Sequence, residues 1–116
     1  MINILNIAAA LLTTAFGLFG FLAPRYTASA LDLAPTHSTM GLSEMRASVG
    51  GLFVVVGCAA LWINAPLSYA MIGFAFVGAA LGRLVSLCLD KPPVKKVILF
   101  GGIEAILAAW FLGANL

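Results

Sequence analysis

Residues 78–104 read GAALGRLVSLCLDKPPVKKVILFGGIE, and this stretch decides the fold. Two successive prolines, Pro92 and Pro93, cannot continue a helix, because proline lacks a backbone N–H and fixes its own φ. The residues on either side of them are almost all apolar. The stretch therefore predicts two antiparallel helices joined by a short polar turn, with one arginine (Arg83) inside the first helix and one glutamate (Glu104) inside the second.

The composition of the whole chain is that of a membrane protein. Of its 116 residues, 63% are hydrophobic and 9% are charged, and the mean hydropathy is +1.13. A soluble domain of this size needs far more charge to cover its surface. The chain has neither a basic stripe nor a polar domain to carry one, which argues against nucleic acid as a partner.

Four apolar runs are each long enough to cross a bilayer, which takes about 18 or more residues in a helix. Because these runs account for nearly all of the chain, we expect a single domain over residues 1–116. The expected fold is all-α, an antiparallel bundle of four transmembrane helices. The expected helices cover residues 4–22, 44–63, 66–89 and 94–113, and a loop covers residues 24–43.

The first apolar run contains no charge and is followed by Arg25. A secretory signal peptide is the competing interpretation, with residues 28–30 as its cleavage site. Signal peptides carry positive charge before the apolar region, and that region is usually shorter, so we expect a retained transmembrane helix. In the loop, residues 28–33 can form a short helix at the membrane surface. Ser43 is the expected N-cap of the second spanning helix.

The positive charges gather on one side of the expected bundle. If the N-terminus lies on one side of the membrane, the loop 24–43 and the turn 90–96 lie on the other. That second side and its adjoining helix ends hold all six lysines and arginines, namely Arg25, Arg46, Arg83, Lys91, Lys95 and Lys96. By the positive-inside rule this side is cytoplasmic, so we expect both termini outside the cytoplasm.

Small residues recur at helical spacing in the last three runs. One face of the second helix begins at Arg46 and continues through Gly50 and Gly57, and the third helix contains Gly78-x-x-x-Gly82. In lipid, small residues let helix backbones approach closely, and we favour packing within the chain over dimerisation. The expected packing glycines are Gly50, Gly57, Gly78, Gly82 and Gly101.

Arg83 and Glu104 need partners, because a charge buried in lipid is costly. At about 1.5 Å of rise per helical residue, Arg83 lies about 9 Å from the cytoplasmic end of its helix and Glu104 about 15 Å from the end of its own. In an antiparallel hairpin their levels then differ by about one turn, which an arginine side chain spans. We therefore expect an ion pair between them.

Glu44 and Arg46, near the start of the second helix, complete a polar set with Arg83 and Glu104. Residues two apart cannot face each other on one helix, so each must look elsewhere, and Glu44 can accept a hydrogen bond from Arg83. In one interpretation the four residues form a buried network that fixes helix register, or the arginines extend to the headgroups. In the other they form a pocket for a lipid headgroup, a small ligand or a proton.

Other reactive residues lack the spacing of a known centre. Cys58 and Cys88 are expected at depths that differ by more than about 15 Å, which no disulfide bridges. His37 is the only histidine, and no Ser-His-Asp set, phosphate loop or metal-spaced cluster occurs. We therefore predict no catalytic residue, no metal and no cofactor, and we favour a protein that is not an enzyme.

Three motifs stand out when the polar residues are read with their spacing: Gly41-x-x-Glu44-x-Arg46-Ala47-x-x-Gly50-Gly51, Gly82-Arg83-x-x-Ser86-x-x-x-Asp90, and Glu104. Together they resemble a bacterial family of small four-helix membrane proteins that is known only as a domain of unknown function, with a distant likeness to DoxX-like bundles. The resemblance covers most of the chain. It implies a bundle in the bacterial inner (plasma) membrane whose characteristic polar residues are Glu44, Arg46, Arg83 and Glu104, and it implies no activity.

Two functional hypotheses follow. The leading one is a non-catalytic integral membrane protein that serves as an accessory or stabilising subunit of a larger membrane complex, because the soluble loops are small and the packing surface is ample. The alternative is a small transporter or a lipid- or small-ligand-binding bundle with a buried pocket at Glu104 and Arg83. Small multidrug transporters carry their essential acid in the first helix, which has none here. The expected partners are membrane lipids and other membrane-protein subunits.

Overall fold

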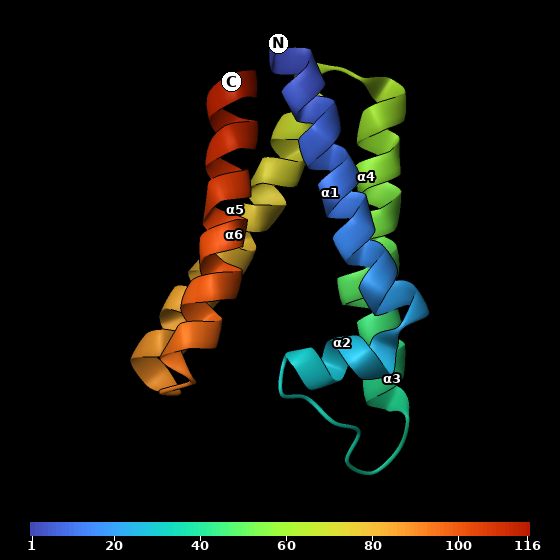
Figure 1. Ribbon diagram of the computed structural model, residues 1–116, viewed down its shortest axis with the longest axis vertical. Coiled ribbons are helices and arrows are strands. Elements are labelled where there is room, and N and C mark those ends of the chain that lie inside the picture. The colour runs from blue at the N-terminus through green and yellow to red at the C-terminus, as the bar shows by residue number, and fades with distance from the viewer. The chain divides into compact units, whose positions relative to one another are not determined.

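The computed structural model describes residues 1–116, and all of its regular elements are helical (Figure 1). Four helical runs are long and apolar enough to span a membrane, namely α1 (Ile2–Leu22), the run Met40–Ile63, α5 (Pro66–Leu89) and α6 (Val94–Asn115). The predicted fold class is therefore confirmed as all-α, with four apolar helices consistent with a four-span membrane bundle. The chain divides into two compact units, the first ending at Ile63 and the second beginning at Asn64.

The second span, in the first unit, is a rod built from three successive helical segments. These are α3 (Met40–Glu44), the π-helix η1 (Met45–Gly51) and α4 (Leu52–Ile63). The rod stays continuous because the residues that flank the π-helix, Glu44 and Leu52, both keep helical φ and ψ. In Figure 1 the rod lies beside α1.

Glycines bring α1 and the rod into backbone contact. A Cβ atom built on Gly17 would lie 2.8 Å from the backbone nitrogen of Val54, and one on Gly20 would lie 2.9 Å from that of Gly50. From the other side, a Cβ atom on Gly50 would lie 2.7 Å from the Cα of Phe21. Each of these distances is too short for a side chain, so the crossing depends on glycine from both helices.

The two threonine hydroxyl groups of α1 are satisfied within the helix. The hydroxyl groups of Thr13 and Thr14 donate to the carbonyl oxygens of Ala9 and Ala10, each at 2.9 Å. Such local bonds let a hydroxyl sit in a hydrocarbon environment at little cost. Thr14 also marks the crossing, because a Cβ atom on Gly57 would collide with its hydroxyl oxygen.

The short helix α2 (Pro24–Ala30) follows α1 and turns away from its direction (Figure 1). The sequence predicted a surface helix at residues 28–33, and the structure has it earlier, because Pro24 is preorganised for the first helical position. Asp32, with φ at 60°, ends the turn that follows. The exposed ring of Tyr26 lies with its centroid 6.2 Å from that of Phe19.

The predicted N-cap at Ser43 is wrong. The helix begins at Met40, and Ser43 lies within α3. The carbonyl of Thr39 accepts the first helical hydrogen bonds, from the N–H groups of Leu42 at 3.0 Å and Ser43 at 3.1 Å. The hydroxyl of Ser38 accepts from the Met40 N–H at 3.2 Å, so the polar residues just before the helix do what Ser43 was expected to do.

The second unit is a hairpin of α5 and α6. At its start, the Tyr69 hydroxyl donates to Asn64 Oδ1 at 2.7 Å, and Asn64 has φ at 49°. The other end of α5 closes with a bond from the Asp90 N–H to the Ser86 carbonyl at 2.8 Å, and Lys91 then takes a positive φ of 48°. The Pro-Pro break lies where the sequence predicted it, and α5 has the predicted bounds.

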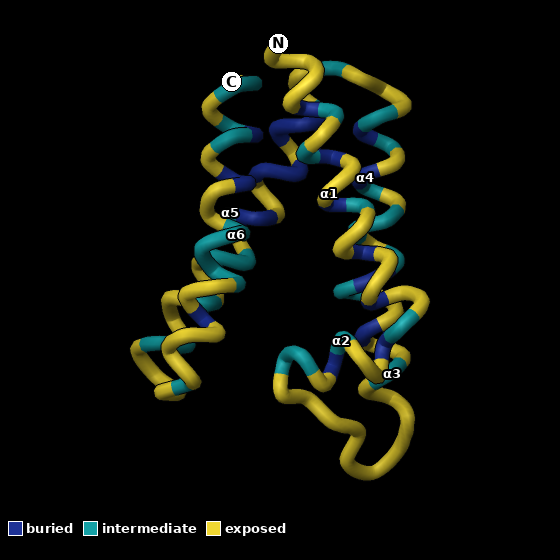
Figure 2. The backbone as a smooth tube through the Cα atoms, in the orientation of Figure 1, coloured by how far each residue is buried: buried dark blue, intermediate teal, exposed yellow.

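Aromatic rings hold the hairpin together in the half remote from its turn. Phe111 stacks between Tyr69 and Phe76, with ring centroids 6.4 Å away in both cases. Ile72 is fully buried, and Gly73 lets the side chain of Leu112 approach α5. Figure 2 shows these buried positions at the end of α5 and α6 away from the turn. The half next to the turn has few buried apolar residues, and it contains Arg83 and Glu104.

Candidate functional site

Arg83 of α5 and Glu104 of α6 form the ion pair that hairpin geometry predicted. Arg83 Nε donates to Glu104 Oε1 at 3.0 Å, and Nη2 donates to Oε2 at 3.4 Å. The guanidinium and the carboxylate thus form a bidentate contact with two hydrogen bonds. Arginine can make this contact and lysine cannot. The Arg83 side chain is 35% exposed and the Glu104 side chain 17%. The arginine is therefore the more accessible partner.

Neighbouring residues of α6 fix the position of the guanidinium. Its central carbon lies 5.6 Å from the ring centroid of Phe100, close enough for a cation–π interaction. A Cβ atom on Gly101 would lie 3.5 Å from both Cβ and Cγ of Arg83, so the aliphatic stem of the arginine rests against the backbone of α6. The stem thus packs on α6 at the level of Gly101, and the head group lies beside Glu104.

Arg83 keeps unused hydrogen-bond donors after it has bound Glu104. A guanidinium has five N–H donors, and the two bonds to Glu104 come from Nε and Nη2. The Nη1 edge of Arg83 makes no hydrogen bond to another residue of the chain. The site therefore combines unused donors with a carboxylate that can take up a proton, and its net charge is zero.

Arg46, in the first unit, was predicted to face away from Glu44 without a named partner, and its partner lies in α1. Its Nη1 donates to the backbone carbonyl of Phe21 at 2.6 Å. That carbonyl belongs to the last turn of α1, whose final C=O groups have no partner within the helix. Glu44 lies in the same unit, and its backbone carbonyl accepts from the Ser48 hydroxyl at 2.8 Å. A single network of Glu44, Arg46, Arg83 and Glu104 stays a prediction.

We expect Arg46→Ala to reduce the free energy of unfolding by about 1 kcal/mol, because it removes a charge-assisted bond at an exposed helix end that water can partly replace. Arg46→Lys should recover part of the loss, since an ammonium still reaches the carbonyl. Unfolding of the detergent-solubilised protein, followed by circular dichroism, measures both variants. Equal free energies of unfolding for Arg46→Ala and the unaltered protein would show that the bond to Phe21 does not stabilise the fold.

The glycines expected to pack have two kinds of environment. Gly50 and Gly57 lie against α1, and Gly101 lies against Arg83. Nothing lies within 4 Å of a Cβ atom built on Gly78 or Gly82, so their packing roles stay predictions. Gly17 and Gly20 also lie in this contact and were not among the predicted packing glycines.

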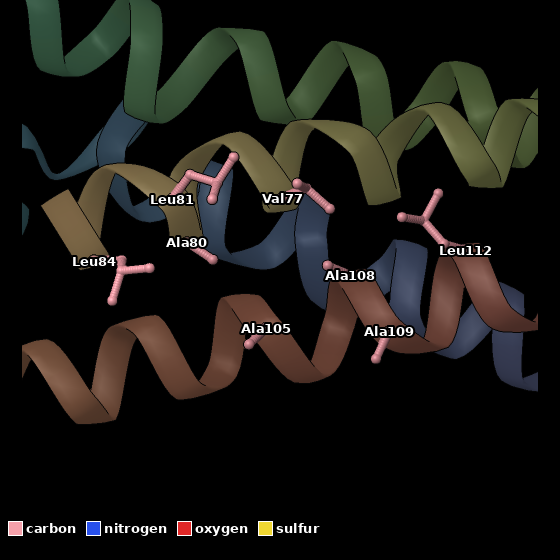
Figure 3. A pocket seen from close by; sticks show the side chains of 8 residues that line it. All are labelled: Val77, Ala80, Leu81, Leu84, Ala105, Ala108, Ala109 and Leu112. Carbon is pink, nitrogen blue, oxygen red and sulfur yellow. The ribbon is translucent and has the colours of Figure 1, made fainter.

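An apolar groove runs along the α5–α6 hairpin (Figure 3). Its volume is about 370 Å³, and its walls are Val77, Ala80, Leu81, Leu84, Ala105, Ala108, Ala109 and Leu112. Neither member of the ion pair belongs to this lining. The groove therefore offers contact to hydrocarbon and supplies no polar group for recognition.

The remaining reactive side chains do not gather around the ion pair. Cys58 and Cys88 are exposed free thiols. No group of three or more His, Cys, Asp or Glu side chains is placed to hold a metal ion. The candidate site therefore consists of Arg83 and Glu104, with Phe100 and Gly101 as the residues that position the arginine.

Comparison with known proteins gives one match. No curated protein and no solved structure matches the chain. The model of a family described as a domain of unknown function, DUF4345, matches residues 1–114. This agrees with the resemblance to a domain of unknown function seen in the spaced polar motifs. Because the match covers nearly the whole chain, this multi-pass membrane protein belongs to the DUF4345 family.

Proposed function

We propose that the protein binds a small polar ligand at the Arg83–Glu104 pair, within the membrane. The forked contact between the two side chains, at 3.0 and 3.4 Å, is the observation that carries this proposal. Ionisable residues inside a membrane span are costly, and they characteristically mark binding sites and proton or substrate paths. Arg83 and Glu104 both lie in apolar helices long enough to span the bilayer.

Hairpin stability alone does not account for the pair. The apolar core of Tyr69, Phe76 and Phe111 already joins α5 to α6. Replacing a buried ion pair by apolar residues is often neutral or stabilising, because the desolvation of two charges offsets their attraction. A ligand site gives the two charges a use that packing does not.

The chemistry of the pair suits a ligand with hydrogen-bond acceptors. Arg83 has unused N–H donors on its Nη1 edge, and its side chain is 35% exposed. Glu104 is the acceptor side of the site and the group that can exchange a proton. The two together can hold a neutral lipid headgroup or a neutral small polar molecule without adding net charge to the membrane interior.

Ligand-dependent stability tests this function. The full chain in lipid nanodiscs would be heated with a panel of acid, amide, amine and quinone amphiphiles. A ligand present at 100 times its dissociation constant stabilises a protein by about 2.7 kcal/mol, which appears as a raised Tm. We expect one class to raise the Tm of the unaltered protein and to leave the Tm of Arg83→Gln unchanged.

Lys95→Gln is the matched control, since it also removes one charge from the hairpin but lies in the first turn of α6. It should respond to the active compound as the unaltered protein does. A panel in which every compound acts equally on the unaltered protein and on Arg83→Gln would contradict a ligand site at the pair.

A second candidate function is an accessory or stabilising subunit of a larger membrane complex. The observation that favours it is the open glycine face of α5, where Cβ atoms on Gly78 and Gly82 would meet nothing within 4 Å. Such a face suits close approach by a helix of a partner subunit. Native mass spectrometry of the untagged protein from its own membrane tests it: stoichiometric companions of other sequence support the subunit, and a bare protein contradicts it.

The placement proposed for the chain is the bacterial inner (plasma) membrane, with both termini outside the cytoplasm. The six lysines and arginines on the loop side support this orientation. A cysteine placed at Ser38, in a variant lacking Cys58 and Cys88, should react with an impermeant maleimide only in inverted vesicles. Labelling in right-side-out vesicles would reverse the orientation. The likeness to DoxX-like bundles belongs to the same proposal and rests on the spaced polar motifs alone.

A further inference from the structure

The carboxylate of Glu104 binds the guanidinium of Arg83 in the same way that the carboxylate of a ligand would bind it. The carboxylate receives Nε and Nη2 side-on, with both of its oxygens engaged. Guanidinium groups recognise carboxylates through this fork because the two planar groups match in spacing. The resident side chain is therefore a template for the ligand, and it indicates a monocarboxylate.

The unused edge of the arginine gives such a ligand a place to land. Nη1 has no protein partner, and the Arg83 side chain is 35% exposed against 17% for Glu104. The carbonyl oxygen of an arriving carboxylic acid can accept a hydrogen bond from Nη1 while the original pair is intact. Phe100 and Gly101 keep the guanidinium in position during this step.

We infer that the Arg83–Glu104 pair binds a neutral carboxylic acid by proton exchange, an inference that rests on the proposed ligand site. The O–H bond of the acid breaks, and its proton forms an O–H bond on a carboxylate oxygen of Glu104. The resulting carboxylate takes the Nε/Nη2 fork of Arg83, and neutral Glu104 moves aside. The products are Glu104 in its acid form and an ion pair between Arg83 and the ligand.

Charge conservation makes this exchange suitable for a membrane interior. One ion pair exists before the step and one exists after it, so no isolated charge is left in lipid, where its free-energy cost is high. The binding of a bare carboxylate would instead place a third charge beside the pair. The site therefore selects the protonated form of the ligand.

No other charged side chain of the hairpin contacts Glu104. Among the titratable groups of α5, Tyr69 donates to Asn64, and Cys88 is exposed. Asp90 and Lys91 lie in the turn, and the remaining charged groups of α6, Lys95 and Lys96, lie in its first turn. Arg83 is thus the single charge that responds when Glu104 gains a proton.

Equilibrium dialysis with radiolabelled benzoate tests the inference on the full chain in lipid nanodiscs. Carboxylic acids are largely ionised in water above about pH 5, so each bound molecule must bring one proton from solution. The affinity for total benzoate should therefore rise about tenfold for each unit by which the pH falls between roughly 8 and 5. The double variant Arg83→Gln/Glu104→Gln provides the value for partition into lipid.

The variants separate the roles of the two residues. Glu104→Gln removes the proton acceptor and leaves Arg83 its charge, so saturable benzoate binding should persist and lose its pH dependence. Arg83→Lys should keep the pH dependence and bind more weakly, because the fork is lost. Arg83→Gln should show no saturable binding. Circular dichroism of each variant establishes that it is folded.

Benzamide distinguishes the inference from the function on which it rests. It has the same ring and a carbonyl acceptor, but it has no carboxyl proton to give. Saturable, Arg83-dependent binding of benzamide without binding of benzoate would keep the ligand site and overturn the exchange. Benzoate binding that is independent of pH in the unaltered protein overturns the exchange as well. Failure of both probes to bind saturably overturns the ligand site and the inference together.

Discussion

Replacing Glu104 by leucine lowers the free energy of unfolding by about 2 kcal/mol. Breaking a fully buried pair typically costs about 3–5 kcal/mol. The loss is smaller here because Arg83 is partly exposed and can extend toward the headgroups. The single variant leaves a guanidinium in an apolar span with no counter-charge. Arginine cannot escape this cost by losing its proton. Reversible unfolding of the full chain in mixed micelles, followed by circular dichroism, measures the loss.

The partner substitutions make the cause of that loss visible. Arg83→Leu should cost less than Glu104→Leu, because an unpaired carboxyl group neutralises itself by taking up a proton. The double variant should lie close to the unaltered protein, as expected when both members of a buried pair are replaced by apolar groups. The resulting double-mutant cycle isolates the interaction energy of the pair. Additive losses for the two single substitutions would show that the ion pair has no energetic coupling.

Gly50→Ala separates α1 from the rod and lowers the free energy of unfolding by about 1–3 kcal/mol, the cost of overpacking a tight contact. The new methyl group would lie on the backbone of Gly20 and Phe21, neither of which can rotate away. Gly50→Val should cost more, since it adds two further carbon atoms at the same place. Unfolding in mixed micelles measures the effect.

Gly102→Ala and Gly113→Ala are the matched controls for the glycine crossing. A Cβ atom at either position meets nothing within 4 Å, and alanine is the better helix former by about 1 kcal/mol in helices exposed to water. Both should be at least as stable as the unaltered protein. Gly50→Ala behaving like Gly102→Ala would mean that α1 and the rod do not meet as closely as the structure has them.

The elements that sequence reasoning recovered are those set by strong local signals. Pro92 and Pro93 stop one helix and precede the next, and Pro66 opens α5, so the bounds of α5 follow from the chain itself. The ion pair also followed from arithmetic, because rise per residue along a short hairpin fixes which positions are level. Neither inference needed knowledge of distant contacts.

The helix start near Ser43 and the place of Arg46 on the second span were predicted less well, and for physical reasons. Ser and Thr residues crowd the end of the loop, and any of them can accept the first helical bonds, so composition does not select among them. The predicted face placed Arg46 in line with Gly50, at the spacing of an α-helix. In the structure Met45 and Gly50, five residues apart, are the buried members of η1.

The bond from Arg46 to Phe21 illustrates a contact that local pattern cannot reveal. It depends on where α1 ends, on the glycines that bring the two helices together, and on the wider turn of η1. Each of these is a tertiary property, because the partner lies 25 residues away along the chain. Hydropathy identifies Arg46 as costly in a span but does not name the carbonyl that it reaches.

The π-helical turn has a consequence for how the length of this chain can change. A hydrogen bond from residue i to i+5 encloses one more residue than the usual i to i+4 bond, so η1 contains one residue beyond what an α-helix needs to cover the same path. Removal of a single residue within Met45–Gly51 can therefore be absorbed by conversion to an α-helix, with α3 and α4 still in line. The same deletion in α5 would rotate Arg83 away from Glu104. Deletion of a single residue should accordingly be tolerated at one point of the second span and rejected along the third.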